Sequence, residues 1–176
     1  MAAPPFYEGI REMMGVICFK RLSDVADRVV TWFVVVLLLG LTAVVTLQIV
    51  ARVFFEAFSW TEELSRYLLV WSTFLGASMG FKRGSHVAIT FVVDLFSGRF
   101  RQWVSVLIHA LSVLFFLVGI VYGFQMIHQQ VYQISPAMGL SMRVVYLAIP
   151  LGFATMAIHV FPLLLDEIVL LVRRKG

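Results

Sequence analysis

The feature that most constrains this fold is a run of 23 residues without a formal charge, from Val29 to Ala51. At a rise of about 1.5 Å per residue, a helix of this length crosses the ~30 Å hydrocarbon core of a membrane. Three further apolar stretches follow, at about 63–81, 103–127 and 144–165. Only 14% of the residues are charged, whereas 61% are apolar. The sequence therefore predicts an all-α integral membrane protein with four transmembrane helices in contact with membrane lipid.

The second stretch is the weakest of the four. Only 15 residues separate Arg66 from Lys82, so both side chains must extend to the membrane interfaces if this segment spans the bilayer. The remaining residues fit interfacial positions. Residues 1–28 form either a short helix on the membrane surface or a frayed tail, residues 86–101 form an amphipathic segment, and 166–176 form a basic tail.

The basic residues are unevenly divided between the two sides that a four-span topology defines. Eleven lie on the side of the termini and three on the other, so the positive-inside rule predicts cytoplasmic termini. This asymmetry also accounts for the net charge of +4 without a nucleic-acid partner. The residues on the side of the termini are Arg11, Lys20, Arg21, Arg28, Lys82, Arg83, Arg99, Arg101, Arg173, Arg174 and Lys175, and those on the other are Arg52, Arg66 and Arg143.

Two adjacent carboxylates, Glu62 and Glu63, stand at the start of the second predicted span. Ser59 and Glu62 have the spacing of a capping box, and negative charge suits the first turn of a helix. Arg66 lies four residues after Glu62 and three after Glu63, which permits ion pairs within the helix. A second interpretation is a contact across helices, either with Arg52 or with a partner protein. The sequence leaves both interpretations open.

Small residues recur at a spacing of four in the second span, at Ser72, Gly76 and Gly80, and the stripe continues to Gly84. Such a stripe lets helix backbones approach closely in lipid, within the chain or against a partner helix. A second stripe comprises Gly119 and Gly123. In the fourth span Pro150 removes a backbone hydrogen bond, which predicts a kink near residues 146–150.

Residues typical of catalysis or substrate binding are sparse. The spans carry no acidic or basic residue near their middles, so we predict no catalytic, substrate-binding or metal site and no enzyme activity. The lone Cys18 excludes an internal disulfide. His86 is placed at the cytoplasmic interface. His109 and His159 fall at similar depths in antiparallel spans, where they either bond neighbouring helices or clasp a haem through two axial ligands.

Several motifs, taken together and in order, resemble the small transmembrane subunit of tripartite ATP-independent periplasmic (TRAP) transporters, the DctQ-like or Q-type family. The resemblance covers about residues 29–160. The matching motifs are Gln48-x-x-x-Arg52, Ser59-Trp60-Thr61-Glu62-Glu63-Leu64-Ser65-Arg66-Tyr67, Val70-Trp71, Phe74-Leu75-Gly76-Ala77, Arg83-Gly84-Ser85-His86, Ser135-Pro136-Ala137 and Tyr146-Leu147-Ala148-Ile149-Pro150-Leu151-Gly152.

This resemblance implies a scaffold subunit of the bacterial inner membrane, paired with a larger elevator-type subunit. That larger subunit would bind the substrate and Na⁺, and a periplasmic binding protein would deliver an organic acid such as a C4-dicarboxylate or sialic acid. The small subunit itself would need no cofactor. The alternative is a membrane anchor of a respiratory complex, with haem held by His109 and His159.

Within that scaffold, we expect the face with Ser72, Gly76 and Gly80 to pack on the large subunit or on the first span. Trp60, Glu62 and Glu63 are expected to fix helix ends or to dock the binding protein. The full set of interface or structural candidates is Arg52, Trp60, Glu62, Glu63, Arg66, Trp71, Ser72, Gly76, Gly80, His86 and Pro150.

Overall fold

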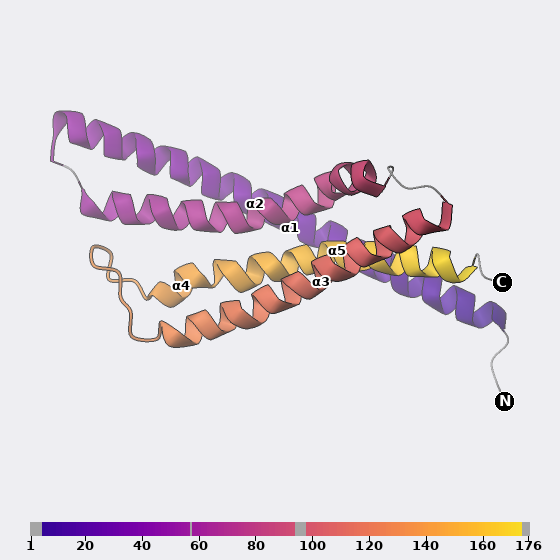
Figure 1. Ribbon diagram of the computed structural model, residues 1–176. Coiled ribbons are helices and arrows are strands. Elements are labelled where there is room, and N and C mark those ends of the chain that lie inside the picture. Colours follow the sequence, from indigo (N-terminus) through magenta and orange to yellow (C-terminus); the bar gives the residue numbers. More distant parts are fainter. Residues whose placement is uncertain (1–4, 57, 94–97, 174–176) are drawn as a thin grey trace.

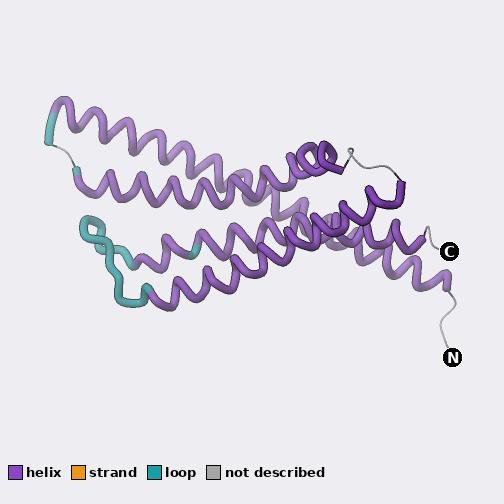
Figure 2. Tube along the Cα trace, in the orientation of Figure 1, coloured by secondary structure: helices purple, strands orange, loops and turns teal. Residues whose placement is uncertain are grey.

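A computed structural model describes residues 5–56, 58–93 and 98–173 and shows four long helices and one short one (Figure 1). The connection after α1 and the loop between α3 and α4 lie at one end, here called the loop end (Figure 2). The first residues of α1 and the last of α5 lie at the opposite end, called the terminal end. The helices are α1 (Pro5–Phe54), α2 (Ser59–Val93), α3 (Gly98–Gln129), α4 (Met142–Tyr146) and α5 (Ala148–Arg173).

Three helical segments among the described residues are long and apolar enough to cross a membrane: Phe19–Phe54, Phe100–Gln129 and Met142–Val169. They contain three of the four predicted spans, and the all-α class is confirmed for the described part of the chain. The other predicted span, 63–81, lies inside α2, which does not meet the same criteria. Serines and glycines dilute its apolar character, and Arg66 and Lys82 bound it. A fourth transmembrane helix therefore stays a prediction.

The interfacial segments are continuous with the long helices. The structure has residues 5–28 as the first half of α1, rather than as a separate surface helix, and residues 86–93 as the end of α2. Residues 98–101 begin α3, and 166–173 end α5. Residues 1–4, 94–97 and 174–176 of the predicted N-terminal, amphipathic and tail segments lie outside the described residues.

The α2 and α5 helices form the centre of the bundle. They contact each other, α1 packs mainly on α2, and α3 packs mainly on α5 (Figure 1). Val30 and Val34 of α1 meet Leu75 of α2 in one apolar cluster, and Phe116 of α3 packs in a second cluster with residues of α5. Only 6% of the most apolar window of α1 is buried within the chain, so its apolar surface is left for lipid or another protein.

Glycines bring the central helices into close contact. A Cβ added at Gly152 of α5 would lie 2.7 Å from the Cβ of Phe74 on α2, and one at Gly123 of α3 would lie 2.9 Å from the Cδ of Pro150. These separations are shorter than the ~3.5–4.0 Å of ordinary carbon contacts. The stripe of Gly119 and Gly123 thus serves packing between α3 and α5 within the chain.

In the region where a kink was predicted, Leu147 separates α4 from α5. The amide of Leu147 still donates to the carbonyl of Arg143 at 2.9 Å, and the helix resumes at Ala148. Pro150 occupies the first turn of α5, where a missing amide proton leaves no helical hydrogen bond unmade. The fourth predicted span is thus divided at Leu147, within residues 146–150, and Pro150 is the third residue of the second helical piece.

Candidate functional site

The loop between α3 and α4 is a compact hairpin at the loop end. Ile134 and Ser141 form an antiparallel bridge, and the amide of Ser135 donates to the carbonyl of Leu140 at 2.8 Å. Gly139 closes the turn with φ of +65°, in the left-handed region that glycine adopts without a steric penalty. Its amide donates to the carbonyl of Ser135 at 3.0 Å. The result is a turn that presents the amides of residues 137 and 138 to α2.

Glu63, the fifth residue of α2, accepts these hydrogen bonds. The amide of Ala137 donates to Oε1 at 3.1 Å, and the amide of Met138 donates to Oε2, also at 3.1 Å. The hydroxyl of Ser135, a residue only 2% exposed, donates to Oε2 as well. One carboxylate thereby fastens the hairpin to the start of α2. The two motifs joined in this way are Ser59–Arg66 and Ser135–Ala137.

The same contacts determine the electrostatics of this carboxylate, which precedes the charge-free stretch 67–81. The hydrogen bond from Ser135, and then those from the amides of Ala137 and Met138, hold the pKa of the Glu63 carboxyl below its usual value of 4.5. Glu63 therefore acts as a permanent anion at neutral pH. It is a hydrogen-bond acceptor and not a candidate proton donor.

Glu62 faces the other way, toward α1. Its Oε1 accepts from the Arg52 guanidinium at 2.9 Å and from the Gln48 amide at 3.5 Å. Of the interpretations left open by the sequence, the structure contains the contact across helices. The α2 helix begins at Ser59 itself, and the hydroxyl of Thr61 donates to the Phe58 carbonyl at 2.7 Å. Glu62 is thus hydrogen-bonded to α1, whereas the capping box would turn it back to the helix start.

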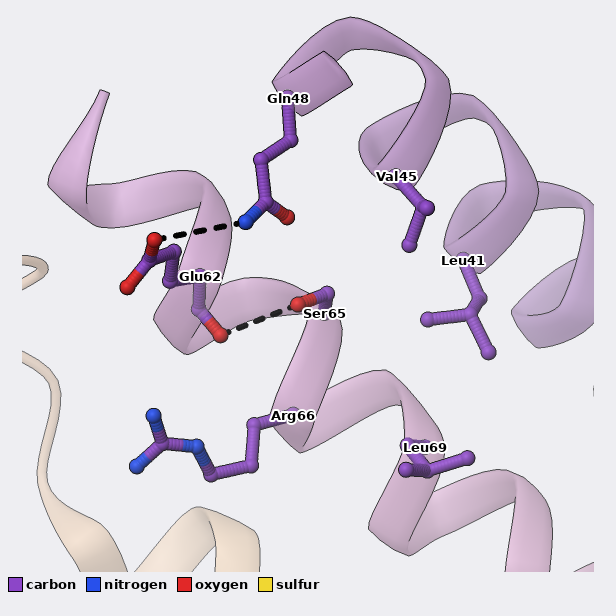
Figure 3. Close-up of a pocket in the computed structure, with 7 residues that line it drawn as sticks. All are labelled: Leu41, Val45, Gln48, Glu62, Ser65, Arg66 and Leu69. Atoms are coloured by element: carbon purple, nitrogen blue, oxygen red, sulfur yellow. Dashed lines mark hydrogen bonds between the residues drawn. The ribbon is translucent and has the colours of Figure 1, made fainter. Parts of the chain in front are cut away.

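A groove of about 500 Å³ lies between α1 and α2 at this end. Figure 3 shows the head groups of Gln48, Glu62 and Arg66 gathered on one side, while Leu41, Val45 and Leu69 lie on the other. Arg66 makes no hydrogen bond or ion pair with another described residue, although its charge lies near Glu63. The groove is lined by Leu41, Val45, Gln48, Glu62, Ser65, Arg66 and Leu69.

The two tryptophans among the candidates have different surroundings. Trp60 is 39% exposed at the loop end and stacks on Phe58, with ring centroids 6.4 Å apart. Trp71 packs edge-on against Phe33 of α1, with centroids 6.1 Å apart, and belongs to the contact between α1 and α2. Trp71 is therefore a packing residue within the chain, and Trp60 presents part of its surface to the outside.

The stripe of Ser72, Gly76 and Gly80 is divided in the structure. Ser72 is buried and donates its hydroxyl to the Leu68 carbonyl at 2.7 Å. A Cβ added at Gly76 or Gly80 would meet no heavy atom within 4 Å among the described residues. The expectation that these two glycines pack on the first span is wrong, because α1 meets α2 through larger apolar side chains such as Leu75.

Charged contacts that the sequence did not reveal also join α1 and α2 between their apolar cluster and the terminal end. Lys82 donates to Asp24 at 2.7 Å and to the carbonyl of Ser23 at 2.9 Å. Arg83 donates to Asp27 at 3.4 Å. The partners are more than 50 residues apart, so only the opposite signs of their charges could have suggested them. His86 lies in α2, but its side chain is outside the described part.

The two histidines considered for haem are engaged by neighbouring groups. Nδ1 of His109 donates to the Ser105 carbonyl at 2.9 Å, and Nδ1 of His159 is hydrogen-bonded to Ser23 at 2.8 Å. The cavity beside His159 has a volume of about 190 Å³, and His109 does not line it. His159 is thus hydrogen-bonded to a neighbouring helix, α1, which was the predicted alternative to binding haem. Among residues 5–56, 58–93 and 98–173, no cluster of metal-ligating side chains was found.

Comparison with known proteins gives a family match. The profile of the family described as "Tripartite ATP-independent periplasmic transporters, DctQ component" matches residues 41–170. The match spans the groove, the hairpin and most of α5.

Individual relatives agree with this match. The chain is 25% identical over 120 residues, 68% of its length, to the "Sialic acid TRAP transporter permease protein SiaT" of Haemophilus influenzae (strain 86-028NP). It is 33% identical over 76 residues, 43% of its length, to a "Putative TRAP transporter small permease protein" of H. influenzae (strain ATCC 51907 / DSM 11121 / KW20 / Rd). It is 28% identical over 106 residues, 57% of its length, to the "Isethionate TRAP transporter permease protein DctMQ" of Oleidesulfovibrio alaskensis (strain ATCC BAA-1058 / DSM 17464 / G20). The alignments cover 20%, 47% and 16% of these relatives, respectively.

Proposed function

The chain belongs to the DctQ family of TRAP transporter components, and from this premise we propose that it is the scaffold subunit that holds a larger, substrate-carrying membrane subunit. The family is one of transporters and not of enzymes. Two relatives are permease proteins much longer than this chain, of which it matches 20% or less. A small chain that corresponds to part of a long permease is suited to act beside a second, larger chain.

The open glycines of α2 are the observation that carries this proposal. Gly119, Gly123 and Gly152 are occupied by close contacts within the chain, whereas the positions beside Gly76 and Gly80 are empty among the described residues. Glycines exposed on a membrane helix permit the close approach of another backbone, and lipid does not require them. A helix of the large subunit fits this face.

The proposal includes how the chain is inserted in the membrane. We assign the fourth span to α2, with the charge-free stretch 67–81 in the hydrocarbon core and Arg66 and Lys82 at its two interfaces. The excess of basic residues at the terminal end assigns both termini to the cytoplasm and the hairpin to the periplasm. The location is the bacterial inner membrane.

The transported solute is an organic acid, taken up with Na⁺ and delivered by a periplasmic binding protein. The names of two relatives, for sialic acid and isethionate, support an organic anion. Na⁺ and solute bind the large subunit in this proposal. Glu62 and Glu63 then fix the helix ends, because their contacts with α1 and the hairpin already engage them.

Uptake by the complete transporter tests this proposal. Cells expressing all components with the Glu62→Lys/Glu63→Lys subunit should lose most Na⁺-dependent uptake of the organic acid, while the amount of subunit in the membrane stays normal. Glu56→Lys, an exposed glutamate at the same end, is the matched control and should retain uptake. Normal uptake by the double variant would remove these carboxylates from the function, and uptake without this chain would overturn the scaffold role.

A further inference from the structure

The groove between α1 and α2 changes from apolar to polar in the same direction on both helices (Figure 3). Toward the loop end, its lining runs from Leu41 and Val45 to Gln48 on α1, and from Leu69 through Arg66 and Ser65 to Glu62 on α2. Seven residues on each helix correspond to about 10 Å along the helix axis. This length and order match the zone of a bilayer in which apolar chains give way to glycerol and headgroups.

Arg66 supplies a positive charge at the polar end, near the carboxylate of Glu63. Its guanidinium has no hydrogen bond or ion pair with another described residue, whereas the neighbouring Arg52 is paired with Glu62 at 2.9 Å. A guanidinium at a membrane interface has donors arranged to bind two oxygens of a phosphate group. The groove therefore has a position for a phosphate next to its apolar part.

Glu62 supplies a complementary acceptor. Both of its hydrogen bonds, from Arg52 and Gln48, end on Oε1. Its Oε2 has no hydrogen bond with another described residue and lies on the same side of the groove as Arg66 (Figure 3). A carboxylate oxygen in this position accepts a hydrogen bond from a primary ammonium group. A quaternary ammonium group has no N–H and cannot donate one.

We propose that the groove binds one phospholipid with a primary-amine headgroup. Its phosphate binds Arg66, its ammonium group donates to Oε2 of Glu62, and its acyl chains leave the groove past Leu41 and Leu69 into the bilayer. A volume of about 500 Å³ suits the headgroup and glycerol region of one lipid. Leu69, the last groove residue on α2, precedes Gly76 by seven residues, which is about two helical turns from the proposed subunit contact.

Native mass spectrometry of the purified full chain, titrated with phosphatidylethanolamine or phosphatidylcholine, tests this proposal. We expect one phosphatidylethanolamine to bind more tightly than phosphatidylcholine. Arg66→Gln should weaken its binding about tenfold, which is the weight of one charge-assisted contact. Glu62→Gln should remove the preference between the two lipids, and Val45→Trp should fill the apolar part and displace both.

Arg143→Gln is the matched control, because Arg143 is an exposed arginine at the same end that does not line the groove. Equal lipid binding by Arg66→Gln and wild type would overturn the proposal, as would an equal loss in Arg143→Gln. Crosslinking from position 45 distinguishes a bound lipid from a helix of the large subunit. Adducts with such a helix instead of lipid would also overturn the proposal. These outcomes are independent of uptake, so they do not decide the scaffold role.

Discussion

A methyl group added at Gly152 tests the central contact between α2 and α5. The new Cβ of Gly152→Ala would lie 2.7 Å from the Cβ of Phe74 and 3.2 Å from its backbone carbonyl carbon and oxygen. Carbon atoms in contact are about 3.5–4.0 Å apart, so the two helices must separate by about 1 Å. Because backbone atoms are involved, a change of rotamer cannot relieve this contact.

The expected magnitude follows from two opposing effects. Overpacking of this kind costs about 1–3 kcal/mol, and the higher helix propensity of alanine offsets up to about 1 kcal/mol. With the middle of the first range, about 2 kcal/mol, and an offset of about 0–1 kcal/mol, Gly152→Ala should lower the free energy of unfolding by about 1–2 kcal/mol. Gly76→Ala is the matched control. Its Cβ meets nothing within 4 Å, so the stability of the isolated chain should stay unchanged or rise by up to about 1 kcal/mol.

Reversible unfolding in mixed micelles, followed by tryptophan fluorescence, measures both variants. Trp71 lies in the contact between α1 and α2 and reports separation of the helices. A Gly152→Ala variant as stable as wild type would refute the close approach of α2 and α5. A clear destabilisation by Gly76→Ala would refute the open face on α2, and with it the reason for placing a partner helix there.

Three further predictions concern the loop end. Glu63→Ala should accelerate hydrogen exchange at the amides of Ala137 and Met138, which lose their acceptor; unchanged exchange would show that the hairpin holds by itself. A double-mutant cycle on Arg52 and Glu62 should give a coupling of about 0.2–1 kcal/mol, because their side chains are 63% and 49% exposed; a much larger value would contradict that exposure. The lowered pKa of Glu63 means that its contribution to stability is present at neutral pH and is lost as the pH falls through the folded-state pKa. The amide chemical shift of residue 137 should accordingly titrate below pH 4.5. A midpoint at or above 4.5 would contradict the three hydrogen bonds that the Glu63 carboxylate accepts from the hairpin.

The long helices could be predicted from sequence because lipid demands long apolar runs with internally satisfied backbones. The contact between Glu62 and Arg52 was among the interpretations because the sequence itself shows two opposite charges at adjoining helix ends. The break before Pro150 also follows from a single residue. In each case the decisive information is local.

The hydrogen bonds between the hairpin and Glu63 could not be predicted in this way. Its three donors lie more than 70 residues further along the chain, and two of them are backbone amides, which no residue type reveals. The glycine stripes show the same limit. Gly123 and Gly76 have the same chemistry, and only the placement of α5 decides which of them is covered. Tertiary contacts likewise override the local capping pattern at Ser59.

Affinity purification of this chain from cells that express the complete transporter is the most direct test of the scaffold role. The wild-type chain should recover a larger multi-span membrane subunit in a constant ratio, and Gly76→Leu/Gly80→Leu should lose it while remaining folded. Val121→Leu, at an exposed position of α3, should recover it normally. Recovery of a redox flavoprotein or a haem absorption band instead, or undiminished recovery with the leucine variant, would contradict the account.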